Sequence, residues 1–211
     1  MRSAIFKHSL PLKKQKMLNF ARQQEISGHM RPIFLLGFMG CGKTTLGKAL
    51  AKAMDRDFID LDRYIEGRFH ATVTQLFAMR GEEGFRDMER RMLLEVADFE
   101  DVVVACGGGT ACHFDNMAHM LSHGLTIHLT TPLPLLVARL KLPGSRQRRP
   151  LLSDKTDEEL IDYVTDALAV RNPYYTQAKL TFDSSRIETA AETAETALIL
   201  AGIIGPIENH N

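Results

Sequence analysis

The sequence has little of what marks several large classes of protein. Among 211 residues it has three cysteines, Cys41, Cys106 and Cys112, without C-x-x-C spacing. This excludes a disulfide framework and is typical of a reducing compartment. There is no net charge, since 26 basic residues face 26 acidic ones, which argues against a general nucleic-acid or membrane-surface binder. The longest apolar run, residues 197–204, is far shorter than the roughly 20 residues of a membrane span. We therefore expect no nucleic-acid partner and no membrane association.

The balanced charge hides an asymmetry along the chain. The first 30 residues carry a net charge of +5, so the remainder carries −5. We interpret residues 1–31 as a disordered basic extension: sequence upstream of a true start at Met30, or residues added for expression, or, less favoured, an organelle transit peptide. Residues 32–201 have the length of one domain and show no internal repeat, and residues 202–211 form a tail. We expect a cytoplasmic protein, with organelle import left open.

A phosphate-loop motif lies near the start of the domain. Gly37 to Thr44 fills every fixed position of G-x-x-x-x-G-K-[ST], between an apolar strand at 33–36 and a helix at 45–54. The alternative, a glycine-rich turn that fits by chance, does not need both flanking elements. Glycines let backbone N–H groups close on phosphate oxygens, and the helix directs its positive end at the same anion. We expect Lys43 to reach the β- and γ-phosphates and Thr44 to offer its hydroxyl to Mg²⁺. The nucleotide-binding residues are predicted to be Gly40, Cys41, Gly42, Lys43, Thr44 and Thr45.

Two carboxylates follow at the end of the next apolar run. Residues 58–62 are predicted to form a short strand, and side chains alternate along a strand, so Asp60 and Asp62 would point to the same side. In an open parallel sheet, ligands bind beyond the carboxyl ends of the strands. One carboxylate could hold hydrated Mg²⁺ and the other could orient or deprotonate an acceptor hydroxyl. Alternatively, Asp62 only caps the next helix.

An arginine in the following helical region suggests a second function. From Thr74 the pattern is helical, Gly81 and Gly84 interrupt it, and Arg86 falls at the start of a second helix beside a core stripe. The helix dipole disfavours a cation at that end, which suggests another role for this side chain. The alternative is a solvated arginine that pairs with Glu89.

A glycine triplet follows the next strand. Residues 102–105 form a buried strand and Gly107, Gly108 and Gly109 come directly after it. Three glycines there permit close approach of a ligand to the backbone, whereas a strand-to-helix turn alone rarely needs three.

A basic segment lies between the later elements. Residues 143–150, within a region 143–154, combine Gly and Pro with Arg146, Arg148 and Arg149, which suggests a lid that closes over phosphates; a solvated basic loop is the alternative. The helix that follows is predicted to end before Pro173. The remaining strands and helices are predicted at 125–129, 132–142, 157–171, 180–182 and 188–201.

Six motifs in this order and spacing resemble shikimate kinase over about residues 32–200. They are the phosphate loop, residues 60–62, residues 83–86, the glycine triplet, residues 149–152 and residues 171–175. The resemblance implies a phosphate-loop kinase fold of the nucleoside-monophosphate-kinase type. That fold is α/β, with three layers and a doubly wound, five-stranded parallel sheet of order 2-3-1-4-5.

The resemblance also implies an activity. It is the ATP-dependent phosphorylation of the 3-hydroxyl of shikimate to shikimate 3-phosphate and ADP, in the route to chorismate and the aromatic amino acids. The implied cofactors are ATP and Mg²⁺, the partner is shikimate, and we expect a monomer. By motif position, the catalytic residues are Lys43, Asp62 and Arg149, the metal site is Thr44 and Asp60, and Arg149 and Arg186 join the nucleotide site. The shikimate site is Asp62, Arg86, Gly107, Gly108, Gly109 and Arg171.

The sequence departs from the family pattern at Cys106, where Ser or Thr is expected, and it leaves open which of Arg139, Arg146 or Arg148 approaches the adenine. Three alternative functions remain. A gluconate or nucleoside-monophosphate kinase would not explain the glycine triplet. A nucleotide-dependent switch would not need an acceptor pocket, and the N-K-x-D motif is absent. An inactive relative would not keep every motif position intact.

Overall fold

The structure is a computed structural model that describes residues 31–142, 144, 152 and 155–205. Nearly all of the predicted basic extension and most of the predicted lid, including Arg149, lie outside the described residues. None of the helices in the described ranges is long and apolar enough to cross a membrane.

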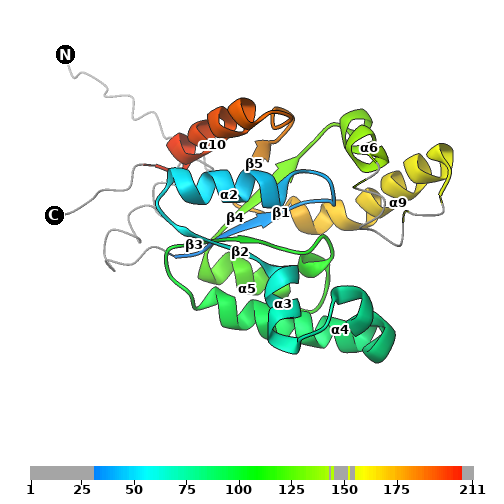
Figure 1. The fold of residues 1–211 in the computed structure, drawn as a ribbon. Coiled ribbons are helices and arrows are strands. Elements are labelled where there is room, and N and C mark those ends of the chain that lie inside the picture. Colours follow the sequence, from blue (N-terminus) through cyan, green and yellow to red (C-terminus); the bar gives the residue numbers. More distant parts are fainter. Residues whose placement is uncertain (1–30, 143, 145–151, 153–154, 206–211) are drawn as a thin grey trace, which may run out of the picture.

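A five-stranded parallel sheet forms the centre of the domain (Figure 1). Its order β2-β3-β1-β4-β5 confirms the predicted one, and β1 pairs with β3 on one side and β4 on the other. Every residue of β1 and β3 is buried, which explains their unbroken apolar sequences, because helices cover both faces of a parallel sheet. The strands are β1 (Ile33–Leu36), β2 (Asp57–Asp60), β3 (Val102–Ala105), β4 (Leu125–Thr130) and β5 (Leu180–Asp183).

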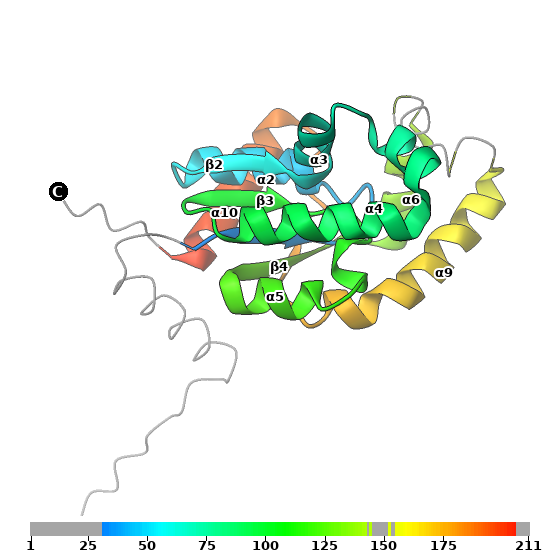
Figure 2. The same ribbon diagram turned by 90° about the horizontal axis from the view of Figure 1, so that it is seen from below.

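Helices cover the two faces of the sheet and complete three layers (Figures 1 and 2). One face carries α2 (Lys43–Ala53) and α10 (Ala190–Ile204), and the other carries α3 (Leu61–Phe69), α4 (Val73–Ala97) and α5 (Asn116–His123). The helices α6 (Leu133–Lys141) and α9 (Asp157–Tyr175) lie beyond the carboxyl ends of the strands, and the 3₁₀ turn η1 (Thr110–Cys112) follows β3. α10 continues three residues into the segment expected to be tail.

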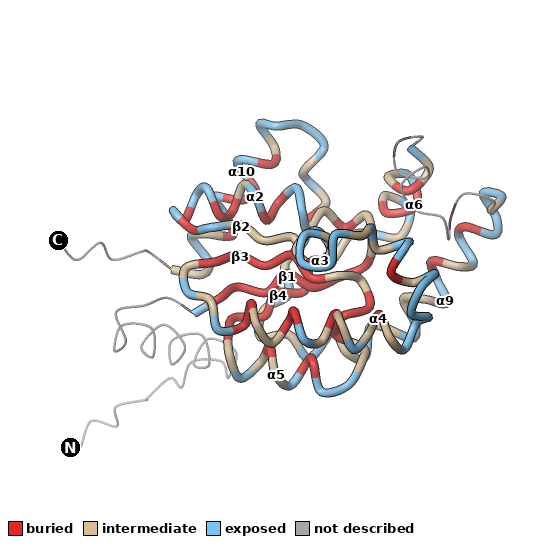
Figure 3. The backbone as a smooth tube through the Cα atoms, turned by 60° about the horizontal axis from the view of Figure 1, so that its bottom comes forward, coloured by how far each residue is buried: buried red, intermediate tan, exposed pale blue. Residues whose placement is uncertain are grey.

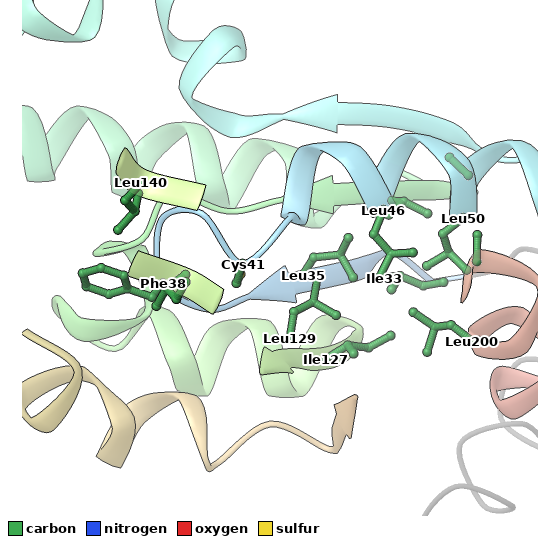
Figure 4. Close-up of a cluster of buried hydrophobic side chains, with 14 of the residues drawn as sticks. Ile33, Leu35, Phe38, Cys41, Leu46, Leu50, Ile127, Leu129, Leu140 and Leu200 are labelled. Carbon is green, nitrogen blue, oxygen red and sulfur yellow. The ribbon is translucent and has the colours of Figure 1, made fainter. Parts of the chain in front are cut away.

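The core consists of two apolar clusters, one on each face of the sheet. Alternation along β1 divides its side chains between them: Ile33 and Leu35 belong to the α2 and α10 side, and Phe34 and Leu36 to the α3, α4 and α5 side. Figure 4 shows the first cluster, in which Leu46 and Leu50 of α2 and Leu200 of α10 pack on the strand residues. Figure 3 shows that burial is concentrated in the strands and the helix faces turned toward them.

Of three sequence predictions about local structure, two were wrong and one was confirmed. β2 ends at Asp60 rather than Asp62, because the Asp60 carboxylate accepts from the Arg63 N–H and caps α3. The predicted interruption at Gly81 is confirmed: α4 consists of two helical segments joined by a kink at that glycine (φ 67°, ψ −178°), and Arg86 lies in the second segment, shortly after the kink. α9 runs through Pro173 to Tyr175, because the fully buried Tyr175 holds the last turn in the core despite the missing N–H.

Candidate active site

The phosphate loop joins β1 to α2, and its backbone admits only glycine at key positions. Gly37, Gly40 and Gly42 have φ values of 139°, 85° and 93°, in the region that favours glycine. A Cβ on Gly42 would also lie 2.0 Å from Ile187 Cδ1. α2 starts at the next residue, so the N–H groups of its first turn, which have no partner within the helix, face the loop. This geometry suits an anion bound by backbone groups, which is what the motif predicts.

Lys43 is the first residue of α2, and its side chain lies across the loop. Its Nζ donates to the carbonyl oxygens of Gly37 (2.7 Å) and Phe38 (3.0 Å). These contacts hold a positive charge where phosphate oxygens would lie in a nucleotide complex. The next residue, Thr44, is exposed and donates from Oγ1 to Asp60 Oδ2 (2.8 Å), which ties α2 to the end of β2. Thr45, next to it, is also exposed.

The Thr44 and Asp60 pair fits a magnesium site. Among the residues that the structure describes, no cluster of three or more His, Cys, Asp or Glu side chains could hold a metal by itself. A hydroxyl and a carboxylate 2.8 Å apart are hard oxygen donors, and Mg²⁺ usually takes few protein ligands because phosphate and water oxygens complete its shell. The donor set therefore suits a metal that enters together with a nucleotide.

The glycine triplet after β3 brings the predicted acceptor residues together. A Cβ on Gly107 would lie 3.0 Å from Asp62 Oδ1, one on Gly108 would lie 3.2 Å from Arg171 Nη1, and one on Gly109 would lie 2.8 Å from Arg86 Nη2. Any side chain here would displace a carboxylate or an arginine, which is why three glycines occur in a row. Asp62 from α3, Arg86 from α4 and Arg171 from α9 thus meet around one short stretch of backbone.

Asp62 has the electrostatic character of a base. It lies half-buried in the first turn of α3 rather than on β2. Burial, and then the neighbouring carboxylates of Asp60 and Glu89, raise the pKa of Asp62 to about 6, while Lys43 opposes the rise. Asp60, and not Asp62, caps the helix, so the capping alternative applies to the other carboxylate. A perturbed pKa beside a phosphate loop marks a candidate functional group.

Arg86 is largely buried and held from several sides. Its Nη1 donates to Glu89 Oε2 (2.8 Å) and its Nη2 to Glu82 Oε1 (3.3 Å), and its guanidinium lies 5.5 Å from the ring centroid of Phe85. The pairing with Glu89 was foreseen, but only for a solvated arginine, whereas this side chain is 14% exposed. These contacts fix the guanidinium beside Gly109.

The sequence analysis named Glu89 only as a partner of Arg86 and did not predict that it belongs to the site. It is a fully buried carboxylate, and it accepts from Arg86 and from Thr110 Oγ1 of the turn after the triplet. It also contributes to the raised pKa of Asp62. The sequence contains a signal for it: Glu89 stands four residues after the core residue Phe85, where the helical period calls for an apolar side chain.

Arg139 is the one of the three candidate adenine arginines that lies within the described residues. From α6 its Nη2 donates to the carbonyls of Ser184 (3.1 Å) and Ser185 (2.9 Å), and its Nη1 approaches Gly40 O (3.4 Å). Ser184 Oγ in turn donates to Cys41 O (2.7 Å), so the loop after β5 is tied to the phosphate loop. Arg146 and Arg148 lie outside the described residues, and Arg186 is exposed and paired with Glu195 (3.1 Å).

Cys106 has a packing role rather than a polar one. Its Sγ lies 3.7 Å from Met120 Sδ in the cluster on the α5 side, and burial raises the pKa of this thiol well above its usual range. A neutral thiol suits this apolar position, which accounts for the departure from Ser or Thr. A hollow of about 450 Å³ next to Phe58 and Phe99 lies at the amino ends of β2 and β3, so it takes no part in this site.

The fold and the site together define a phosphate-loop kinase. The parallel sheet of order 2-3-1-4-5, a glycine loop carrying Lys43 and Thr44, and an adjacent pocket of carboxylates and arginines are the parts that phosphoryl transfer to a small acidic acceptor requires.

Comparison with known proteins identifies the family. The family model described as shikimate kinase matches residues 39–200, and the chain belongs to that family. A shikimate kinase of Phocaeicola vulgatus is 55% identical over 159 residues, which are 75% of this chain and 90% of that protein. The crystal structure of shikimate kinase from Bacteroides thetaiotaomicron has a TM-score of 0.80 at 46% identity, covering 84% of this chain and 99% of the other. Shikimate kinase from Acinetobacter baumannii in complex with shikimate has a TM-score of 0.71 at 31% identity, covering 83% and 93%.

Proposed function

We propose that this chain, a shikimate kinase by family, transfers the γ-phosphoryl group of ATP to the 3-hydroxyl of shikimate. The products are ADP and shikimate 3-phosphate, and the reaction belongs to the route to chorismate and the aromatic amino acids. One observation carries the assignment of the site: a carboxylate and two arginines from three helices meet on a glycine triplet beside the phosphate loop. Shikimate has hydroxyls for the carboxylate and an acid group for the arginines, so the pocket matches both ends of the acceptor.

On this proposal, Asp62 orients the 3-hydroxyl and accepts its proton as the oxygen attacks. The new bond joins that oxygen to the γ-phosphorus, the bond from the γ-phosphorus to the bridging oxygen breaks, and ADP leaves. Arg86 and Arg171 hold the substrate carboxylate, which leaves the ring hydroxyls turned toward Asp62 and the phosphate loop. Because such transfers need little covalent work from the protein, the contribution of these residues is positioning and charge.

Lys43 supplies charge on the nucleotide side. Its ammonium group contacts two loop carbonyls 2.7 and 3.0 Å away, and phosphate oxygens would replace these partners. Mg²⁺ is part of the proposal: Thr44 and Asp60 would hold it through their oxygens, and when bound it neutralises charge on the phosphates. Arg149 in the predicted lid at 143–154 and Arg186 stay predictions from the family resemblance, as do a monomeric state and a cytoplasmic location.

The proposal is tested by an acceptor comparison. Purified protein with ATP and Mg²⁺ is given shikimate, gluconate or a nucleoside monophosphate, ADP release is followed in a coupled assay, and ³¹P NMR identifies the ester formed. Of the three acceptors, we expect only shikimate to support ADP release, and we expect a single product phosphorylated at the 3-hydroxyl. Faster turnover of gluconate or a nucleotide, or an ester at another hydroxyl, would contradict the assignment.

A further inference from the structure

A tyrosine that the mechanism does not use lies one helical turn from Arg171. Tyr175 is the last residue of α9 and is 1% exposed. Because residues four apart share a face of a helix, Arg171 and Tyr175 both face the glycine triplet. The hydroxyl of Tyr175 donates to the carbonyl oxygen of Gly108. Gly108 is also the glycine whose Cβ would lie 3.2 Å from Arg171 Nη1.

The ring of Tyr175 is fixed as firmly as its hydroxyl. It belongs to the core cluster on the α3, α4 and α5 side, and its centroid lies 5.2 Å from that of the buried His128 ring on β4. Burial raises the pKa of the Tyr175 hydroxyl above its usual range, although Arg171 opposes the rise. The hydroxyl therefore remains protonated, and remains a donor, at every working pH.

Other contacts also bear on Arg171: its guanidinium lies 5.2 Å from the centroid of the Phe38 ring in the phosphate loop, and Leu168, one turn earlier, packs against the cluster on the opposite face of the sheet. Leu160 and Val164, in the first half of the helix, pack in the cluster on the opposite face of the sheet. Figure 1 shows α9 running outward from the carboxyl end of the sheet, so its two ends are anchored in different parts of the core. Arg171 lies between them, nearer to Tyr175. A small rotation of the last turn would move the guanidinium away from the triplet.

We propose that Tyr175 is a positioning residue, which sets the distance between Arg171 and the glycine triplet and thereby the affinity for the substrate carboxylate. The inference rests on the proposed function, because it assigns that carboxylate to Arg171. Paired contacts between an arginine and a carboxylate require placement within about 0.5 Å, which one buried hydrogen bond to the same backbone can provide. The hydrogen bond of Tyr175 goes to Gly108 on the acceptor side, so we expect the larger effect on shikimate.

The test is Tyr175→Phe, which keeps the ring and removes only the hydroxyl. We expect the KM for shikimate to rise about 3- to 10-fold, as for loss of one buried hydrogen bond, with the KM for ATP within twofold of the wild type. The matched control is Tyr174→Phe, which removes the same atom from the neighbouring, half-buried tyrosine and should leave both constants unchanged. A rise in both KM values, or a fall in kcat alone, would assign Tyr175 a general structural role and overturn the proposal.

A double-mutant cycle separates positioning from any direct contribution. If Tyr175 acts through Arg171, then Tyr175→Phe should change kcat/KM for shikimate less than twofold in an Arg171→Ala background. Full additivity of the two losses would overturn the proposal. Failure of the proposed function would look different, since wild-type protein would then not phosphorylate shikimate at all. If Tyr175→Phe also lowers the unfolding midpoint, the proteins of the cycle are compared by calorimetric titration with shikimate at 10 °C. The change in shikimate affinity then distinguishes positioning from a direct contribution in the same way.

Discussion

The proposed nucleotide half and the proposed acceptor half of the site are built from different kinds of chemical group. In the nucleotide half the partners are backbone groups: Lys43 binds two loop carbonyls and Ser184 binds a third, around glycines with positive φ. In the acceptor half the partners are charged side chains from α3, α4 and α9, which meet at the glycine triplet. A triphosphate is the same in every kinase, so backbone can recognise it, whereas acceptor choice requires side chains.

The difference predicts that the halves fail in different ways. Damage to a charge in the acceptor half should spare nucleotide binding, and damage to a glycine in the loop should spare the acceptor. Each variant below has a control at a similar position outside the site.

The largest effect is expected from Asp62→Asn. The change preserves size and most hydrogen bonding but removes the base, so kcat should fall by about 10²- to 10⁴-fold while both KM values stay within threefold. The control is Asp57→Asn at the exposed start of β2, which should match the wild type. Steady-state kinetics with each substrate varied in turn would check this. A variant with more than half of the wild-type kcat would remove Asp62 from the chemistry.

The second effect is expected from Arg86→Ala. Loss of a charged contact to the substrate carboxylate should raise the KM for shikimate about 10- to 100-fold, with the KM for ATP unchanged. The same change leaves the buried Glu89 without its arginine, so we also expect a lower unfolding midpoint. The control is Arg91→Ala at an exposed position of the same helix. An unchanged KM for shikimate would show that Arg86 serves only to pair Glu89.

The third effect tests the backbone half. Gly42→Ala places a Cβ at φ 93°, which strains the backbone, and 2.0 Å from Ile187 Cδ1, so the Ile187 side chain must move. The strain alone is of the order of 1–2 kcal/mol, and we expect the KM for ATP to rise about 30-fold with a much smaller change for shikimate. The control is Gly67→Ala in α3, where a Cβ meets nothing within 4 Å. Equal losses for both substrates would mean that the two halves are not separable.

The same difference explains what the sequence could predict. The proposed nucleotide half is one contiguous segment whose glycines, Lys43 and Thr44 have fixed spacing, so pattern alone predicted it. The strand and the helix predicted on either side of it are confirmed. The sheet order came from resemblance, which the structure confirmed. The proposed acceptor half joins residues more than 100 positions apart. The resemblance predicted Asp62, Arg86 and Arg171 for it, and the structure brings all three to the glycine triplet, but their contacts could not be predicted.

The failures concern competition between local and tertiary preferences. Alternation along a strand placed Asp62 on β2, but the carboxylate of Asp60 caps α3 and starts the helix earlier. Proline chemistry ended α9 before Pro173, but the buried Tyr175 keeps the last turn helical. Glu89 and Tyr175 act through hydrogen bonds to Thr110 and Gly108, and no spacing rule reveals such partners.

The smallest effect is a pH dependence of the acceptor half. The pKa of Asp62 is raised to about 6, chiefly by burial, and the base is competent only when deprotonated. We therefore expect kcat/KM for shikimate to be level above pH 7 and to fall about tenfold per pH unit below pH 6.

The contribution of Asp62 to stability should change with pH in the opposite direction. Because the folded pKa lies above the unfolded value near 4, the folded state holds a proton that the unfolded state has lost between about pH 4 and 6. The contribution of Asp62 to the free energy of unfolding thus decreases as the pH rises through that window. Asp62→Asn should flatten this slope, whereas Asp57→Asn should keep it. Thermal unfolding of the three proteins at half-unit pH steps, beside the wild-type rate profile, would check both signs. A wild-type profile that stays level to pH 5 would mean that Asp62 is not the titrating base.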